Sequence, residues 1–194
     1  LDGTGGTGGH SAAILRALSA VGRLVVVDQD PDALAVARAR LGGESERVRF
    51  HRGSFHRLDE ALSAAGLEAV DGILLDLGLN SWTLARPEKG LSYTVDVPLG
   101  MALDPDLRRT AADLLANVTE NQLARLLAEY GGVRRARLFA RRIVEARRRA
   151  GLRTTGDLVR AVQGGVPGSV REDELSQIFQ AVRVEVGEEM ARLE

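Results

Sequence analysis

Apolar and polar positions over the first 76 residues alternate between short continuous runs and helix-like segments. The apolar runs at 24–27 and 70–75 are typical of strands buried on both faces, and 48–51 is a third candidate strand. Between them lie helical patterns at 11–20, 30–41 and 58–65. Strands separated by helices of about ten residues predict parallel βαβ units, and hence an α/β fold with a doubly wound sheet.

The pattern changes after residue 80. Residues 80–106 show no periodicity and are punctuated by proline and glycine, which predicts a long loop of the kind that is usually functional. From residue 110 onward only helical patterns occur, and Thr119 with Gln122 forms a capping box. We expect the later helices at 133–150, 154–162 and 172–193.

The first residues carry the strongest local signal. Glycines fill five of the seven positions from Gly3 to Gly9, and His10 then opens a helical pattern. Glycines let a backbone approach a ligand closely, and a helix start presents free N–H groups to it. Such a loop normally follows a strand, and Leu1 alone precedes Asp2, so we expect the chain to begin inside a longer protein.

An acid in the right place makes this loop a candidate cofactor site. Asp28 lies 20 residues after Gly8, at the end of the next predicted strand, where a carboxylate can accept the hydroxyls of an adenosine ribose. Asp2 would hold the ammonium group of S-adenosylmethionine, whereas it would repel a dinucleotide pyrophosphate. An NAD-linked oxidoreductase remains an alternative, because Gly3-x-Gly5-x-x-Gly8 also matches the dinucleotide fingerprint. A glycine-rich turn with a helix-capping Asp28 is the purely structural alternative.

A second candidate site follows the predicted strand at 70–75. Asp76 closes that strand, and Asn80 and Ser81 follow four and five residues later. Ligands of open α/β sheets bind outside the carboxyl ends of the strands, so Asp76 can accept a hydrogen bond from a cofactor or substrate amine. Turn capping is the structural alternative.

Composition narrows the function further. The chain has no cysteine, which excludes disulfides and thiol nucleophiles and fits a cytoplasmic location. It has no apolar run of the roughly 18 residues that a membrane helix needs, and no secretory signal pattern. His51 and His56 lack metal-ligand spacing, so we assign no metal.

Charge is unevenly distributed along a chain whose net charge is only −1. Nine arginines and one acid, Glu145, lie between Arg134 and Arg153. Arginine is well suited to phosphate contacts, although a solvated face of an arginine-rich protein would show the same pattern. The candidates for RNA contact on one helix face are Arg134, Arg137, Arg141 and Arg148.

With these residues in place, the chain strongly resembles the MraW/RsmH family, the bacterial 16S rRNA cytosine-N4 methyltransferases. The resemblance covers nearly the whole chain and rests on motifs in a fixed order. They are Asp2-Gly3-Thr4, Gly8-Gly9-His10-Ser11, Val27-Asp28-Gln29-Asp30-Pro31, Gly53-Ser54-Phe55, Val70–Gly78, Gly90-Leu91-Ser92-Tyr93, Tyr130-Gly131 and Phe179-Gln180-Ala181-Val182-Arg183.

The resemblance implies a Rossmann-like S-adenosylmethionine methyltransferase core, truncated at both ends, with an inserted all-helical domain that helps to recognise RNA. On this basis 1–103 would be the core with an active-site loop at 78–103, 104–171 the RNA-recognition insertion, and 172–194 a helix returning to the core. The implied partner is 16S rRNA of the small ribosomal subunit. The implied cofactor contacts are Gly8, Gly9, His10, Asp28, Phe55 and Asp76.

Several positions depart from the family pattern. Asn80 replaces the first of two serines, and Thr83 stands where the family has a glutamine that contacts the cofactor. Further departures occur at Gly100, Ala102 and Gly187. We therefore expect an S-adenosylmethionine-dependent rRNA methyltransferase with Asp76, Asn80 and Ser81 placing the target amine, and a non-catalytic relic of the family as the alternative.

Overall fold

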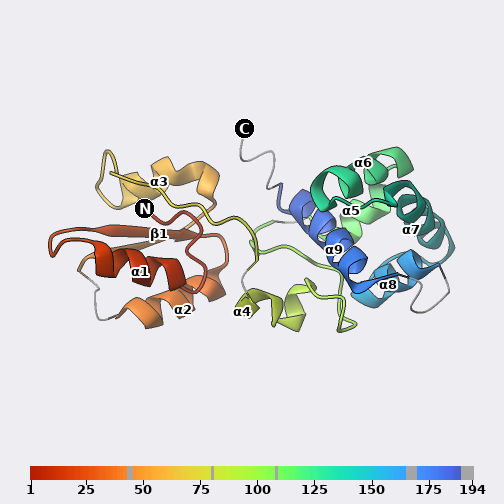
Figure 1. Ribbon diagram of the computed structural model, residues 1–194, viewed down its shortest axis with the longest axis horizontal. Helices are drawn as coiled ribbons and strands as arrows, with labels where there is room; N and C mark the ends of the chain where they lie inside the picture. Colours follow the sequence, from red (N-terminus) through yellow and green to blue (C-terminus); the bar gives the residue numbers. More distant parts are fainter. Residues whose placement is uncertain (43–45, 80, 108, 165–169, 189–194) are drawn as a thin grey trace. The chain divides into compact units, whose positions relative to one another are not determined.

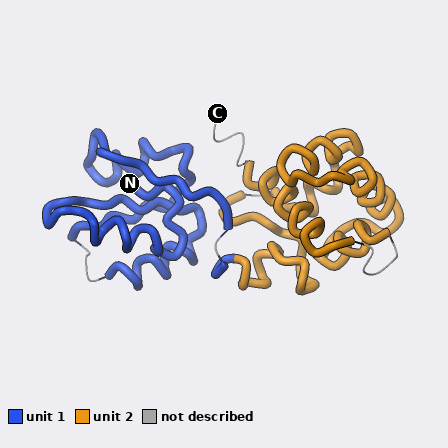
Figure 2. Tube along the Cα trace, in the orientation of Figure 1, with its two compact units in different colours: residues 1–83 blue, residues 84–194 orange. Residues whose placement is uncertain are grey.

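The computed structural model describes residues 1–42, 46–79, 81–107, 109–164 and 170–188. The chain forms two compact units, residues 1–83 and residues 84–194 (Figure 2). The predicted functional segments at 1–103, 104–171 and 172–194 divide the chain differently and stay a prediction.

The first unit is built on a small parallel sheet. Strands β1 (Leu24–Asp28) and β2 (Val48–Arg52) pair in parallel, with Leu24 opposite Val48 and Asp28 opposite Arg52. Asp2 bridges to Val26 on one side and to Leu74 on the other. The spatial order is therefore β2, β1, the segment at 1–3 and the segment around residue 74, which is the 3-2-1-4 order of a doubly wound sheet. The predicted parallel α/β core is confirmed.

Helices cover both faces of this sheet because β1 is apolar on both faces. Leu24 and Val26 pack against α1 and α2, whereas Val25 and Val27 pack against residues of α3. Figure 1 shows α1 and α2 on one side of β1 and α3 on the other. The bounds are α1 Gly9–Ala17, α2 Pro31–Leu41 and α3 Leu58–Ala64, with a 3-10 turn, η2, at Phe55–Arg57.

The prediction of a buried strand at 70–75 is wrong. This segment makes one parallel bridge, with Leu74 N–H donating to Leu1 O at 2.8 Å and Leu74 O accepting from Gly3 N–H at 2.9 Å. Ile73, Leu75 and Leu77 are exposed. Its paired neighbour at 1–3 is short, and no further strand among the described residues covers its other edge. The apolar run is present, but its partners are too few for a buried strand.

The core of the second unit is formed mainly by helices, and Leu99 and Met101 of the preceding loop are buried with them. The helix α6 packs against both α7 and α9, α7 packs against α8, and α5 contacts α7 and α9. Fully buried residues come from all five of these helices, among them Leu115, Leu127, Phe139, Leu158 and Ile178. The bounds are α5 Ala111–Asn117, α6 Glu120–Gly131, α7 Ala136–Ala150, α8 Thr155–Gln163 and α9 Glu172–Val186. A short helix, α4, spans Ser81–Leu84, and a 3-10 turn, η3, spans Pro87–Lys89.

Local sequence signals explain where these helices begin and end. The predicted capping box of Thr119 and Gln122 is present at the start of α6. The helix predicted from residue 133 begins only at Ala136, because the chain leaves α6 through Gly132 in the left-handed conformation, with φ at 63°. The helix predicted to 193 ends at Val186, where the poor helix former Gly187 follows.

The predicted long loop is fastened to the helical unit at one end. Thr155, at the start of α8, donates its backbone N–H to Val97 O at 2.9 Å, and Leu99 N–H donates to Arg153 O at 2.9 Å. The Thr155 side chain is fully buried and donates to Val95 O at 2.6 Å. Among the described residues, no helix is both long and apolar enough to span a membrane.

Candidate functional site

The glycine-rich loop runs from the first extended segment into α1. Gly5 N–H donates to Val27 O at 2.8 Å, and Gly8 caps α1 in the left-handed conformation, with φ at 81°. A Cβ on Gly8 would lie 3.2 Å from the Ala37 backbone, and a Cβ on Gly5 would overlap the Val26 side chain. Both glycines are thus needed for the loop to lie close to β1 and α2. The N-cap residue of α1 is Gly8, so no side chain at that position caps the helix.

Asp2 lies beneath this loop and not on its surface. Its side chain is fully buried, accepts a hydrogen bond from Ser11 Oγ at 2.6 Å, and accepts a weaker one from Thr4 N–H at 3.3 Å. In this structure Asp2 joins the loop to α1. Its predicted contact with a cofactor ammonium group finds no support in its position.

Asp28 holds the loop from the other side. Its Oδ2 accepts a hydrogen bond from Gly6 N–H at 2.7 Å, and its Oδ1 accepts one from Asp30 N–H at 2.8 Å. Burial raises the pKa of Asp28, and these two N–H groups offset only part of that rise. The predicted cap of α2 is Asp30, which accepts from Asp32 N–H at 3.0 Å. Because each carboxylate oxygen has a second lone pair, Asp28 can still accept ribose hydroxyls.

Asp76 lies at the same edge of the sheet. Its N–H donates to Thr4 Oγ1 at 2.7 Å, and its Oδ2 is 3.5 Å from His10 Nδ1. Both side chains of the His10–Asp76 pair are more than half exposed, so they are accessible to a ligand. The glycine loop, Asp28 and Asp76 therefore converge on the switch point between the first and fourth extended segments, where open α/β sheets bind ligands.

The other predicted site residues are placed less tightly. Phe55 is half-buried at the start of η2, whose preceding turn is held by Gly53 N–H donating to Asp28 O at 3.0 Å. Ser81 is exposed at the start of α4, whereas Thr83 is buried. Asn80 lies outside the described residues. In the described part of the chain no cluster of His, Asp and Glu side chains is arranged to hold a metal ion.

The structure also assigns positioning roles that spacing had not indicated. Thr4 and Ser11 hold Asp76 and Asp2 by the hydrogen bonds given above. Both lie within the motifs that identify the loop, but their hydroxyl partners are 72 and nine residues away. Only the folded sheet brings such partners together.

The arginines in and just before α7 fall into two groups, those that bind other helices and those that are exposed. Arg142 donates to Val162 O near the end of α8, and Arg147 donates to Leu115 O and Val118 O at the end of α5, each at 2.7 Å. Arg135 binds Glu174 of α9 through two hydrogen bonds of 2.9 and 2.7 Å. These three arginines hold helices together.

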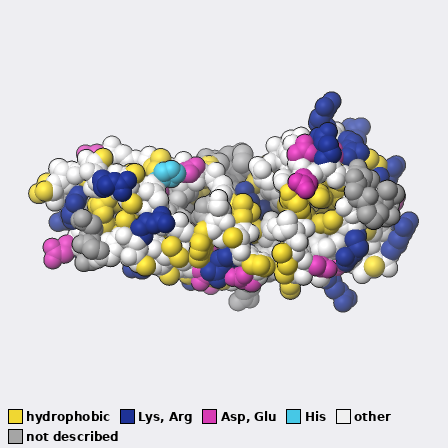
Figure 3. Space-filling view, turned by 60° about the horizontal axis from the view of Figure 1, so that its bottom comes forward, with side chains coloured by type: hydrophobic (Ala, Val, Ile, Leu, Met, Phe, Trp, Pro, Cys, Tyr) yellow, Lys and Arg dark blue, Asp and Glu magenta, His cyan; other side chains and the backbone are white. Residues whose placement is uncertain are grey.

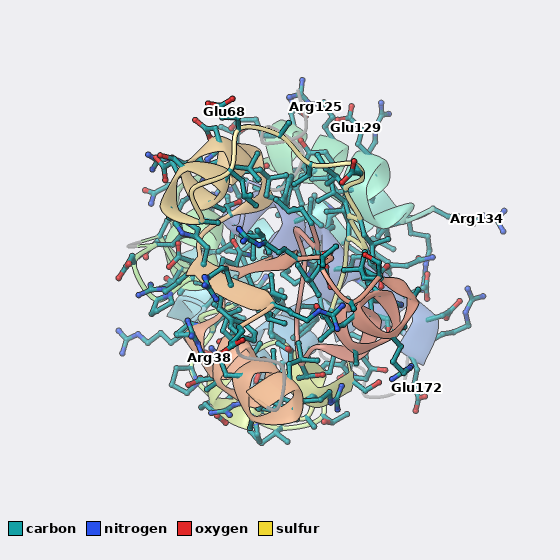
Figure 4. All side chains as sticks on the ribbon, turned by 90° about the vertical axis from the view of Figure 1, so that its left-hand side faces the viewer. Arg38, Glu68, Arg125, Glu129, Arg134 and Glu172 are labelled. Carbon is teal, nitrogen blue, oxygen red and sulfur yellow. The ribbon has the colours of Figure 1, made fainter. Side chains whose placement is uncertain are left out.

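The four arginines that we predicted as an RNA-contact face are all exposed, namely Arg134, Arg137, Arg141 and Arg148. Figure 4 shows Arg134 pointing away from the ribbon into solvent. In the view of Figure 3, Lys and Arg side chains project from the helical unit at several places.

The sequence is similar to those of several curated proteins. The chain is 40% identical to ribosomal RNA small subunit methyltransferase H of Heliobacterium modesticaldum, matching all of this chain and 63% of that protein. It is 43% identical to the protein of the same name from Thioalkalivibrio sulfidiphilus, over 62% of that protein's length. The corresponding values for Acidothermus cellulolyticus are 42% and 60%.

The chain thus spans about three fifths of the length of these curated relatives. These likenesses favour neither an NAD-linked oxidoreductase nor a non-catalytic relic. The family model described as "MraW methylase family" matches residues 1–194. The chain belongs to the MraW methylase family.

Proposed function

We propose that this chain binds S-adenosylmethionine and serves the N4-methylation of a cytosine in 16S rRNA of the small ribosomal subunit. The observation that carries the proposal is the convergence of the glycine loop, Asp28 and Asp76 at one edge of the sheet. The names of the relatives support an rRNA substrate. Such a substrate would place the protein in the cytoplasm.

The residues present fit S-adenosylmethionine. The cofactor supplies an electrophilic methyl group when it is bound. Asp28 would accept the ribose hydroxyls, Phe55 would pack against the adenine, and the backbone at Gly8 and Gly9 would approach the methionyl part closely. His10 and Asp76 would hold the charged amino-acid end, because they pair at 3.5 Å on an exposed surface beside the loop. Thr83 is buried, so it would act on the cofactor only by supporting the segment at Ser81.

The chemistry requires positioning more than acid strength. The exocyclic amine of cytosine is a poor nucleophile because its lone pair is delocalised into the ring, so it must be oriented in line with the methyl group. Asp76 would accept a hydrogen bond from that amine and take the proton that leaves the nitrogen, because its exposed carboxylate lies beside the glycine loop. Ser81 and Asn80 would complete the positioning. The target base has to be unpaired or flipped out to reach them.

RNA would be held by the second unit. The exposed arginines Arg134, Arg137 and Arg141 follow each other at three- and four-residue steps, and Arg148 lies two turns further on. Guanidinium groups pair with phosphates in a fixed geometry, so a row of them suits a phosphate backbone. The inserted, RNA-recognising character of this unit is part of the proposal.

The decisive experiment is methyl transfer from labelled S-adenosylmethionine to small ribosomal subunits that lack the modification. We expect labelled N4-methylcytosine with the wild-type chain and a large loss with Asp76→Ala. Cofactor binding without transfer, seen by calorimetry, would instead support the non-catalytic relic. Absence of cofactor binding would reject both readings.

A further inference from the structure

The helical unit contains a groove that is lined by residues of α6 as well as by arginines at the start of α7. It encloses about 700 Å³ between α6 and the start of α7. Sites that enclose ligand-sized groups occupy about 300–1,000 Å³. Its size therefore suits a piece of ligand and exceeds what a few water molecules need. The lining residues are Asn121, Ala124, Arg125, Ala128 and Val133 to Leu138.

The charge of this groove is of one sign. Its described lining contains four arginines, Arg125, Arg134, Arg135 and Arg137, and no acid. Arg135 is occupied by Glu174 and lies over the Phe139 ring at 4.8 Å. The other three are exposed and extend from two different helices or their ends.

Arg125 is the member that comes from outside the arginine-rich segment. Its Nε lies 3.7 Å from Glu129 Oε2, and both side chains are more than half exposed. Figure 4 labels both residues on the same side of the molecule. Exposed ion pairs of this kind contribute little to stability. A phosphate can therefore replace Glu129 as the partner of Arg125 at a small cost in free energy.

Between the arginines the groove is lined by small apolar side chains. Ala124, Ala128, Val133 and Ala136 contribute no hydrogen-bonding side chain. A surface of this kind can contact the face of a base or a sugar, whereas the arginines around it can hold the flanking phosphates. An acidic peptide would satisfy the arginines but would have no planar group for the apolar part.

We propose that this groove binds an unpaired nucleotide segment of the substrate RNA, with Arg125, Arg134 and Arg137 on its phosphates and the apolar lining against a base or sugar. The inference rests on the proposed function for the identity of the partner as RNA. It extends that function by adding α6, through Arg125, to the RNA-binding surface. It also makes the binding site concave, whereas the row along α7 alone would be a convex ridge.

Charge and shape are tested separately in the full chain, with a short fluorescently labelled RNA hairpin as the probe. Arg125→Gln removes one groove arginine, and Arg16→Gln removes an exposed arginine from α1 of the first unit as its charge-matched control. The double variant Ala124→Leu/Ala128→Leu fills the groove and keeps every charge. Ala116→Leu, at an exposed position of α5, is the control for added apolar bulk.

We expect Arg125→Gln to weaken RNA binding about twofold to fivefold. It should also reduce the slope of log affinity against log salt by about 0.7. The filled groove should weaken binding at least as much with an unchanged salt slope, and both controls should match the wild type. Equal affinity for all four variants would overturn the proposal, as would competition by poly-glutamate as strong as that by unlabelled RNA.

Methyl transfer to small ribosomal subunits separates this inference from the proposed function. If the wild type transfers methyl groups and the groove variants do so at the wild-type rate and with wild-type RNA affinity, the groove proposal fails and the function stands. If the groove variants lose RNA affinity while the wild type transfers no methyl group, the function fails and the groove stands. A wild type that binds no RNA overturns both.

Discussion

At the level of single residues, carboxylates and hydroxyls hold backbone N–H groups in place around the candidate site. Asp28 accepts from Gly6 and Asp30, and Thr4 accepts from Asp76. These bonds position the loop and the acid before any ligand arrives. The remaining lone pairs of Asp28 are then available for a ribose, so in our proposal a single side chain both shapes the site and contacts the ligand.

Replacement of Asp28 separates these two roles. Asp28→Asn keeps the size of the side chain but removes the charge and one acceptor. Hydrogen bonds to charged groups are about twice as strong as neutral ones, so we expect S-adenosylmethionine to bind about tenfold to a hundredfold more weakly. Calorimetry measures the affinity, and circular dichroism checks that the fold is retained. Wild-type affinity in Asp28→Asn would remove Asp28 from the cofactor site.

The same residue predicts a pH dependence. Burial raises the pKa of Asp28, and the charged form is the one that accepts the ribose hydroxyls. Cofactor affinity should therefore fall as the pH decreases through the raised pKa, beginning above the ordinary value of about 3.9. Folding stability changes in the opposite sense, because the protonated group stabilises the folded state at low pH and this contribution is lost as the pH rises through the folded-state pKa. Titration calorimetry between about pH 7 and pH 4.5 tests the first effect, and Asp28→Asn should lack it.

Thr4 provides a second test at this scale. Thr4→Val removes the acceptor of Asp76 N–H and keeps the shape of the side chain, whereas Thr4→Ser keeps the hydroxyl. A neutral hydrogen bond contributes about 0.5–1.5 kcal/mol, so kcat for methyl transfer should fall about twofold to tenfold in Thr4→Val. Thr4→Ser should restore it, and KM for the cofactor should rise in Thr4→Val and not in Thr4→Ser, because Asp76 would also hold the amino-acid end of the cofactor. Equal kcat values for both variants would show that Thr4 does not position Asp76.

Sequence reasoning reached some of these residues and missed others for a physical reason. The position of Asp28 could be predicted, because Asp30-Pro31 marks the start of the next helix and therefore places Asp28 at the end of the strand before it. The burial of the Asp2 side chain could not be predicted, because residue spacing does not reveal its hydrogen bond of 2.6 Å with Ser11 Oγ in the folded chain. Hydrogen bonds between distant residues depend on the sheet and not on the local pattern.

At the level of elements, the same distinction separates helices from strands. Capping boxes and glycine ends placed α6 closely, because these signals are local. The segment at 70–75 has the composition of a buried strand but lacks neighbours on one edge within the described residues. Burial of a strand is decided by what packs beside it, which its own residues do not encode.

The arginine-rich helix gives the prediction that belongs to this scale. Arg135 lowers the pKa of Glu174 through its side-chain hydrogen bonds and thereby joins α7 to α9. Arg135→Gln should lower the urea midpoint of unfolding at pH 7, because Glu174 is buried and loses its partner. Arg134→Gln, one residue earlier and exposed, is the matched control and should unfold as the wild type does.

The pH dependence of this pair has a defined sign. A depressed carboxyl pKa contributes stability above its unfolded value of about 4.3, and this contribution is lost as the pH falls through the lower folded value. The difference in urea midpoint between the wild type and Arg135→Gln should therefore become smaller as the pH is lowered toward about pH 3. A gap that stays constant with pH, or equal midpoints for the two arginine variants, would contradict the role assigned to the pair.

At the level of the whole molecule, the chain has two cores, and we assign a different task to each. Residues 1–83 enclose a sheet core and hold every described candidate for cofactor contact. Residues 84–194 enclose a helical core and hold the exposed arginines that we assign to RNA. Because each unit has its own core, a ligand that binds one unit should stabilise mainly that unit.

Hydrogen exchange in the full chain tests this division with two ligands. A ligand at about 100 times its Kd stabilises the state that it binds by about 2.7 kcal/mol, enough to slow exchange strongly in that unit. S-adenosylmethionine should slow exchange from Gly6 to Ser11 and at the end of β1, with little change in α7. The labelled RNA hairpin should instead slow exchange in α6 and at the start of α7, where the groove lies. RNA protection confined to α1 and α2 would place the RNA on the first unit and refute the division of tasks, and so would equal protection of both units by the cofactor.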